Sequence, residues 1–477
     1  MQSTGNMKKT TLAICAAAIT AMLYLVFTGV LEAAAKATHS DQIVTAALMT
    51  LPVFFAIIFN VVVGVLTKYI RPKVLGIITL GLAVVGGFPC FLMGSEQTLT
   101  QIKELESTGG AITSVLYDNV WILFLAVCFT GLATAMVTTI LNTIIMQEYP
   151  EEKQFGIMGL QNAFGGYGAA AMSLICGLMV SLTDKMTPFY VPMFIITIVL
   201  LIIFCICCPK GHTVPKAIAD EKGNKPKLGK APWFYVCYLA IYMCASMGFL
   251  VQYGMRVVMG FGYAESSPVV TMLPVAALTL GATMGLLSGK IENKLGNNVI
   301  ILGPCLCLIG QLLSFFAPDG VPGVVMCYVA GAFVGAGLTI TLSSAIFGFV
   351  KTTPIQWSSF MTGLSTAIGN FVTLLYITYF VYNFGTGGSF MNIQLGGAVF
   401  APMNTIYKIG FVKSFIRSCS NAGSQAGPVL LFNCIILIGV IIAAIIRAHI
   451  ENKQAKDLSW DMSDFDDFDS ENDDYDF

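Results

Sequence analysis

The chain has 477 residues, of which 56% are hydrophobic and only 11% are charged. Because soluble domains carry about 25% charged residues, this composition excludes a soluble enzyme with a membrane tail. The formal net charge of −1 hides an asymmetry: residues 457–477 hold ten of the 26 acids and no base, which leaves 16 acids against 25 bases elsewhere.

Twelve apolar stretches of about 19 to 29 residues follow one another along the chain, separated by polar loops. A helix needs roughly 20 residues to cross a hydrocarbon core of about 30 Å. Since hydrocarbon offers no partner to a backbone N–H or C=O, each stretch is predicted to be a helix. The predicted spans are residues 11–33, 42–67, 74–94, 120–146, 156–182, 188–208, 233–253, 267–289, 298–316, 321–349, 357–383 and 427–447.

The distribution of Lys and Arg predicts the orientation. Placing both termini in the cytoplasm puts 18 of the 25 basic residues inside and 7 outside, in agreement with the positive-inside rule. Lys8, Lys9 and the apolar run after them resemble a signal peptide, but a run of about 23 residues is long enough to span and we expect it to be retained. We therefore expect a multi-pass protein of the plasma membrane, embedded in the lipid bilayer.

The chain is predicted to form two bundles of six spans each, residues 1–208 and 233–450. The second bundle includes an extracellular loop at 384–426. Residues 209–232 are rich in Lys, Pro and Gly and predict a flexible cytoplasmic linker. The acidic residues of 451–477, interrupted by aromatic ones, predict a disordered cytoplasmic tail.

An internal repeat supports this division. When the chain is shifted by 204 residues, 126–165 aligns with 330–369 without a gap, and eight of the forty positions are identical. Among the matches, Pro150 meets Pro354 and Gly159 meets Gly363. The shift superposes the fourth span on the tenth and the fifth on the eleventh, and such repeats around a central site are typical of transporters.

The connection after the eighth span carries a motif of a known family. Residues 289–298 read Gly-Lys-Ile-Glu-Asn-Lys-Leu-Gly-Asn-Asn and resemble the motif Gly-x-Leu-x-Asp-Arg-x-Gly-Arg-Arg of the major facilitator superfamily. The positions that fit are Gly289, Ile291, Lys294 and Gly296. Asn293 replaces the acid of the motif.

The first-half copy of the motif lies at residues 64–73, where Gly64, Leu66 and Lys73 fit. Lys68 stands where the acid belongs, which puts the family's usual inner-gate ion pair in question. The resemblance covers the whole chain in topology and implies an all-α fold of twelve transmembrane helices in two pseudo-symmetric bundles. It also implies transport of a small organic solute by alternating access, secondary active or facilitative.

A weaker likeness concerns the drug–proton antiporter branch of this family. Residues 252–263 and Pro274 resemble the join between its seventh and eighth helices, whereas residues 159–171 lack the proline of its fifth-helix signature. Multidrug or metabolite efflux by proton antiport is therefore kept as an alternative.

The resemblance implies that spans one, four, seven and ten line the substrate cavity, so their polar residues are candidates for it. These candidates are Tyr24, Thr28, Thr138, Asn142, Gln252, Tyr253, Thr339 and Ser343. The alternative is that these side chains only form hydrogen bonds along or between helices.

No predicted span has a charged residue near its middle. Glu32 lies near the outer end of span one and Arg256 just past span seven, and we hypothesise that they pair when the outer gate is shut. The alternative is that each reaches separately into the headgroups. The scarcity of membrane-buried charge weakens proton antiport, which needs a carboxylate, and favours a neutral or amphipathic organic solute.

The sequence lacks the motifs of other functions. The sequence has no Gly-x-x-x-x-Gly-Lys-Ser/Thr loop for ATP and no Gly-x-Ser-x-Gly elbow, so we expect neither an enzyme nor a cofactor. The three histidines are far apart, and no metal site and no nucleic-acid partner are predicted. We expect a monomer. A non-transporting sensor or scaffold, whose acidic tail recruits a cytosolic partner, is the alternative from another class.

Overall fold

A computed structural model describes most of the chain. The described residues are 7–21, 42–87, 125, 128, 129, 131–133, 135–183, 187–214, 228–255, 269, 272–318, 320–376 and 426–470. Each of the twelve predicted spans contains helical residues, and no strand occurs in this part of the chain. The all-α prediction is therefore confirmed.

The first half begins with a helix over residues 7–21. The helices that follow are α2 (Gln42–Leu66), α3 (Pro72–Leu82) with the π-helix η1 (Ala83–Gly87), the π-helix η3 (Met136–Leu141) with α6 (Asn142–Glu148), α7 (Glu151–Thr183) and α8 (Thr187–Cys207). Pro72 lies in the first turn of α3, where its missing N–H leaves no hydrogen bond unmade.

The described helices of the second half range from a three-residue 3-10 helix to the 45 residues of α18. They are α9 (Lys230–Met255), α11 (Leu273–Leu295), the short 3-10 helix η5 (Gly296–Asn298), α12 (Val299–Phe315), α13 (Val321–Thr352), α14 (Ile355–Leu375) and α18 (Ala426–Ser470). Gly296 has a φ of 51°, a conformation that favours glycine, and it ends α11 before the chain turns into α12.

Among the described residues, three helical segments are long and apolar enough to cross a membrane: Val275–Phe315, Val321–Thr352 and Phe432–Gln454. The first of them joins two predicted spans through the polar connection around Gly296. Shorter apolar helices occur at Val53–Leu66, Pro72–Leu82 and Phe194–Cys207. These lengths and compositions are those of an integral membrane protein.

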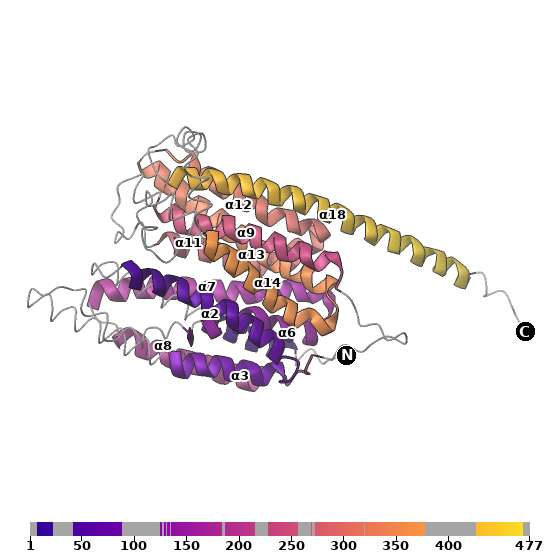
Figure 1. Ribbon diagram of the computed structural model, residues 1–477, viewed down its shortest axis with the longest axis horizontal. Coiled ribbons are helices and arrows are strands. Elements are labelled where there is room, and N and C mark those ends of the chain that lie inside the picture. Colours follow the sequence, from indigo (N-terminus) through magenta and orange to yellow (C-terminus); the bar gives the residue numbers. More distant parts are fainter. Residues whose placement is uncertain are drawn as a thin grey trace, which may run out of the picture.

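Each half has its own hydrophobic core. Met136 and Phe204 are fully buried in the core of the first half, as are Tyr242 and Leu437 in that of the second. Figure 1 shows the helices of the first half grouped below those of the second, with α2 and α7 next to the upper group. The two groups meet along α2–α14 on one side and along α7 with α11 and α13 on the other.

The described basic residues gather at one end of the bundle. We call it the basic end, because every Lys and Arg among the described residues lies there or beyond it. Glu151 at the start of α7 and Lys351 at the end of α13 mark this end.

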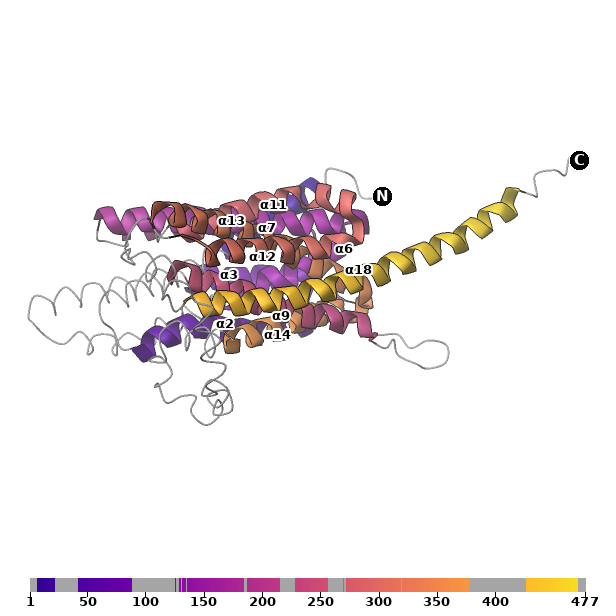
Figure 2. The same ribbon diagram turned by 90° about the horizontal axis from the view of Figure 1, so that it is seen from above.

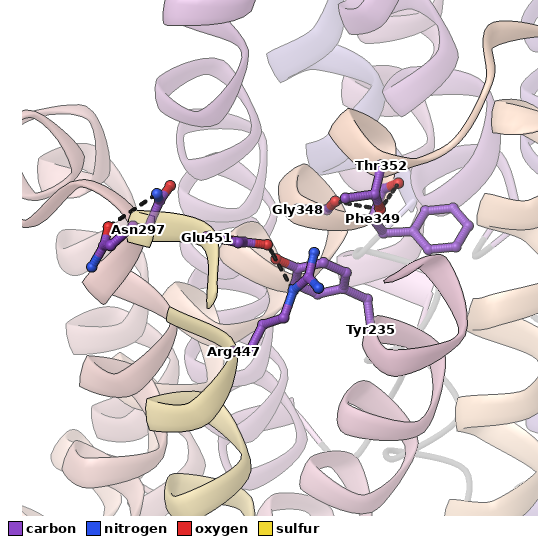
Figure 3. Close-up of polar contacts among 8 residues, drawn as sticks. Tyr235, Asn297, Gly348, Phe349, Thr352, Arg447 and Glu451 are labelled. Atoms are coloured by element: carbon purple, nitrogen blue, oxygen red, sulfur yellow. Dashed lines mark hydrogen bonds and ion pairs between the residues drawn. The ribbon is translucent and has the colours of Figure 1, made fainter. Parts of the chain in front are cut away.

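The last helix is anchored to the second half at the basic end (Figure 3). Tyr235 of α9 donates its hydroxyl to Oε1 of Glu451 on α18 at 2.5 Å, and Arg447 Nε donates to the same oxygen at 2.8 Å. The Arg447 guanidinium lies 5.4 Å from the Tyr235 ring. Asn297 of η5 donates to Asn452 at 3.1 Å, so α18 is held from two sides.

The tail from residue 451, for which disorder is predicted, begins inside the last helix. Helix α18 continues to Ser470 and extends beyond the bundle in both Figure 1 and Figure 2. A helix already nucleated by a membrane span lengthens without a new nucleation step. Lys453, Gln454 and Ala455 are also strong helix formers, so the backbone continues in helical form.

The first residues of the predicted linker lie against the first half. Val214 is buried and donates its N–H to the Thr67 carbonyl at 3.1 Å, so residues 209–214 are held against the first half. The linker, the tail and the other domain boundaries stay predictions.

Candidate functional site at the seam between the halves

Glycine brings α7 and α11 into backbone contact. A Cβ added to Gly159 of α7 would lie 1.8 Å from Ser288 Oγ and 2.7 Å from the Gly285 carbonyl oxygen of α11. A Cβ on Gly156 would lie 3.5 Å from the Cα of Gly289. Small residues at such positions let membrane helices pack through van der Waals contact of their backbones. The motif residue Gly289 is therefore part of the contact between the two halves.

Polar contacts extend this packing toward the middle of the bundle. Asn162 of α7 donates to Ser343 Oγ of α13 at 3.0 Å, and Tyr167 and Thr283 share a hydrogen bond of 2.9 Å between their hydroxyls. Tyr167 lies sixteen residues along α7, about 24 Å from its start at roughly 1.5 Å per residue. The α7 side of the seam is thus closed from the basic end to about half the thickness of the bundle.

Asn60 organises the other side of the seam. It is fully buried in α2, and its Oδ1 accepts hydrogen bonds from the hydroxyls of Thr138 and, at 2.9 Å, Thr139. Both threonines belong to the π-helix η3, and π-turns inside helices occur often at functional sites. The Asn60 carbonyl oxygen in turn lies against Gly363 of α14, where an added Cβ would approach within 2.3 Å.

Ser359 of α14 forms a second buried junction nearer the basic end. Its Oγ accepts hydrogen bonds from Thr67 at 2.8 Å and from Thr143 at 3.0 Å, and it is 1% exposed. Helices α6 and α14 and the turn after α2 therefore share one hydroxyl group. We call the cluster of Asn60, Thr67, Thr138, Thr139, Thr143 and Ser359 the polar floor.

Lys68 closes the same side at the basic end. Its Nζ lies 4.7 Å from the centroid of the Trp357 ring and 5.7 Å from that of Phe360, both on α14. A cation within about 6 Å of an aromatic centroid is attracted by the ring's quadrupole. The lysine that departs from the family's motif thus makes a cation–π contact across the seam.

Carboxylates gather at the basic end of the α7 side. Glu151 and Lys351 form an exposed ion pair of 3.4 Å between the halves. Glu292, in the connection after the eighth span, is half-buried beside them. Burial raises its pKa from 4.5 to about 7, while nearby Lys351 lowers the pKa and nearby Glu151 raises it further. Glu292 therefore changes its charge near neutral pH.

The structure describes the side chains of four of the predicted cavity residues. Thr138 is part of the polar floor, and Asn142 donates its amide to the Thr138 carbonyl at 2.6 Å. Thr339 is buried and donates to the Gly335 carbonyl at 3.2 Å, and Ser343 accepts from Asn162. The structure thus gives these residues hydrogen bonds within and between helices, and their role in the substrate cavity stays a prediction.

The remaining predicted residues are placed as follows. Tyr24, Thr28, Glu32 and Arg256 lie outside the described residues, and for Gln252 and Tyr253 only the helical backbone of α9 is described. In the loop motif, Lys73 donates to the Cys208 carbonyl at 2.6 Å, and Leu66 is half-buried at the end of α2. Gly64 packs against Ser359 and Phe360, whereas Asn293 and Lys294 are exposed.

Sequence reasoning missed Asn60, Ser359, Trp357 and Glu292 as site residues. Asn60 carried a usable signal, because a buried amide in an apolar span needs hydrogen-bond partners. Ser359 and Trp357 carried none, since their importance depends on which helix faces α14. Among the described residues, no group of three or more His, Cys, Asp or Glu is arranged to hold a metal ion.

The fold and this seam define a helical membrane transporter built from two halves. The chain belongs to the family described as the Major Facilitator Superfamily, which matches residues 12–377. The resemblance drawn from the loop motifs is therefore confirmed, and the chain is a membrane transporter of a small solute.

Two solved structures share the fold. One is FucP, a transporter of this superfamily in the outward conformation, with a TM-score of 0.58 and 14% identity over 92% of this chain and 98% of that chain. The other is the human organic anion transporter MFSD10 (TETRAN), with a TM-score of 0.55 and 12% identity over 92% of this chain and 99% of that chain. No curated protein matches the chain.

Proposed function

We propose that the chain moves a small organic solute by alternating access and that this structure is the state closed at the basic end. The observation that carries the proposal is the seam: all cross-half hydrogen bonds named above lie between the basic end and the level of Tyr167. A transporter that rocks its two halves must break such contacts to open toward this side. The likeness to FucP in its outward conformation agrees with this state.

The chemistry of the polar floor supports a neutral or amphipathic solute. Its groups are an amide and five hydroxyls, and no described residue with a charged side chain lies at the level of Asn60. Such groups bind hydroxyls, carbonyls and amides through hydrogen bonds and give little stabilisation to a full charge. We propose no chemical conversion of the solute.

The basic end is proposed to face the cytoplasm of a plasma-membrane protein that acts as a monomer. The collection of the described Lys and Arg at this end supports the orientation through the positive-inside rule. Under it both termini are cytoplasmic.

A solute screen followed by flux measurement tests the proposal. A ligand that binds only the native state raises the unfolding temperature, so the purified chain is screened against a panel of metabolites and drugs. Each hit is then measured for flux into proteoliposomes with and without a pH gradient, which separates facilitated transport from proton antiport. Thr138→Val should weaken a true hit, whereas Thr352→Val, a hydroxyl removed at the basic end, should not. Binding without flux for every hit would contradict the proposal.

A further inference from the structure

A cavity lies away from the seam, at the basic end of the first half. It has a volume of about 520 Å³ and is lined by the ends of helix 7–21, α3, α6 and α8 and by the segment after α8. The charged or titratable residues on its wall are Lys9, Arg71, Glu148, Lys210 and His212. We call this cavity the basic pocket.

The wall after α8 is held in place at several points. Lys73 Nζ donates to the Cys208 carbonyl at 2.6 Å. Gln147 exchanges two hydrogen bonds with the His212 backbone, donating at 2.8 Å and accepting at 3.1 Å. Gly211 between them has a φ of 61°, and a Cβ there would lie 3.0 Å from Gln147 Oε1. The turn that presents Lys210 and His212 to the cavity is therefore a fixed element of the fold.

The charge of the basic pocket suits an anion. Lys9, Arg71 and Lys210 supply three positive charges against the single carboxylate of Glu148, and all three basic residues are exposed. Arg presents a planar fork that matches two phosphate oxygens, and Lys supplies a mobile point charge. These are the groups with which proteins bind phosphate.

The apolar residues around the basic pocket indicate the source of a phosphate ligand. On α3, Val74 and Ile78 are each 46% exposed, and on α8, Ile202 is 50% and Ile206 is 75% exposed. Ile206 itself lines the pocket. In a membrane-spanning helix such apolar faces contact acyl chains, so the cavity opens where a lipid headgroup would meet the protein.

We propose that the basic pocket binds a phosphate group, presented by an anionic phospholipid of the leaflet at the basic end. Arg71 and Lys210 contact the phosphate oxygens, Lys9 adds charge, and the acyl chains lie along α3 and α8. The site is separate from the polar floor and does not depend on the transported solute.

Thermal unfolding of the full-length purified chain in zwitterionic detergent tests the proposal. The probes are phosphatidylglycerol, phosphatidylcholine, glycerol 3-phosphate and inorganic phosphate, at equal ionic strength. The pocket variant carries Lys9→Gln, Arg71→Gln and Lys210→Gln. The matched control carries Lys230→Gln, Lys290→Gln and Lys294→Gln, three exposed lysines of the same end that lie outside the pocket.

Phosphatidylglycerol is expected to raise the unfolding temperature of the wild type and the control more than phosphatidylcholine does. In the pocket variant its apparent affinity should fall about tenfold or more. An equal effect of glycerol 3-phosphate on the wild type would support the phosphate site and overturn its lipid source. No preference for anionic lipid in the wild type, or an equal loss in the control, would overturn the proposal.

A second measurement covers the case in which the triple variant does not fold. The single variants Arg71→Gln and Lys210→Gln are compared with Lys294→Gln by native mass spectrometry, counting the phosphatidylglycerol molecules retained per chain. One fewer retained molecule in the pocket variants alone is expected. Equal retention in all three would count against the site.

Discussion

Lys68 and Trp357 face each other across the seam, with the lysine Nζ 4.7 Å from the centroid of the indole ring. Trp357 lies in the first turn of α14, and the start of a helix carries partial positive charge. A carboxylate at position 68 would be favoured there, whereas an ammonium is not. The aromatic faces of Trp357 and Phe360 supply the attraction that the helix terminus cannot, so in this structure Lys68 makes a different interaction from the one the family motif implies.

Replacing Lys68 should loosen this closure. Lys68→Gln removes the cation and should shift the balance of closed to open states by about fivefold, for a contact worth about 1 kcal/mol. Lys68→Arg should retain the closed state, because a guanidinium also stacks on aromatic rings. Hydrogen–deuterium exchange in the first two turns of α14 reports the change, with Lys294→Gln as the control. Unchanged exchange in Lys68→Gln would show that the contact does not hold the seam.

A side chain at position 159 should disrupt the backbone contact between α7 and α11. In Gly159→Ala the new Cβ would need the space of Ser288 Oγ, 1.8 Å away, so the helices must separate. Overpacking of this kind destabilises by about 1–3 kcal/mol. The free energy of unfolding in detergent is the measurement, and Gly439→Ala is the control, since nothing lies within 4 Å of its added Cβ. Adding Ser288→Gly to Gly159→Ala should restore part of the loss.

The helices could be predicted from local properties of the chain, but the seam could not. Apolar length and the absence of backbone partners in hydrocarbon place spans such as α13 within a few residues of their observed ends. The internal repeat and the loop motif then predicted that the chain forms two halves. The pairing of Asn60 with Thr138 depends instead on how two helices far apart in sequence cross, and no local signal encodes that crossing.

The residues at the end of α18 show a different limit of reasoning from composition. Its composition of acids and aromatics is typical of disorder. Composition does not take into account that Asp457 follows a membrane helix that is already formed. That helix removes the nucleation step of helix formation. Glu292 was passed over for a similar reason, because its burial by α7 of the other half is not visible in its own stretch of sequence.

The anchor of α18 should contribute more stability than the ion pair between the halves. The side chains of Arg447 and Glu451 are 12% and 19% exposed, against 56% and 59% for Lys351 and Glu151. Glu451→Gln removes the charged acceptor of two hydrogen bonds and should lower the free energy of unfolding by about 1–3 kcal/mol. Glu151→Gln should change it by less than about 1 kcal/mol, since exposed ion pairs contribute little. Equal effects of both variants in thermal unfolding would contradict this ranking.

The last prediction concerns pH and the closed seam. Glu292 lines a cavity of about 250 Å³ together with Glu151, Glu152, Lys351 and Glu451, and one of its carboxylate oxygens is buried with no hydrogen-bond partner among the described residues. Its pKa is about 7 in this structure, against 4.5 when solvated, so the proposed closed state binds a proton that an open state with a solvated Glu292 would release. The ratio of closed to open states should therefore increase as the pH falls from about 7 toward 4.5. It should decrease as the pH rises through 7.

Glu292→Gln mimics the protonated acid and should abolish this dependence. Because Glu292 is half exposed, the wild-type change should be modest, roughly threefold to tenfold in the ratio of closed to open states. The fluorescence of Trp357, with Trp121, Trp233 and Trp460 replaced by Phe, follows the seam between pH 5 and 8. Glu152→Gln is the matched control, an exposed carboxylate on the same cavity, and it should keep the wild-type profile. A Glu292→Gln profile that still turns near pH 7 would assign the titration to another group, because the substituted amide does not ionise.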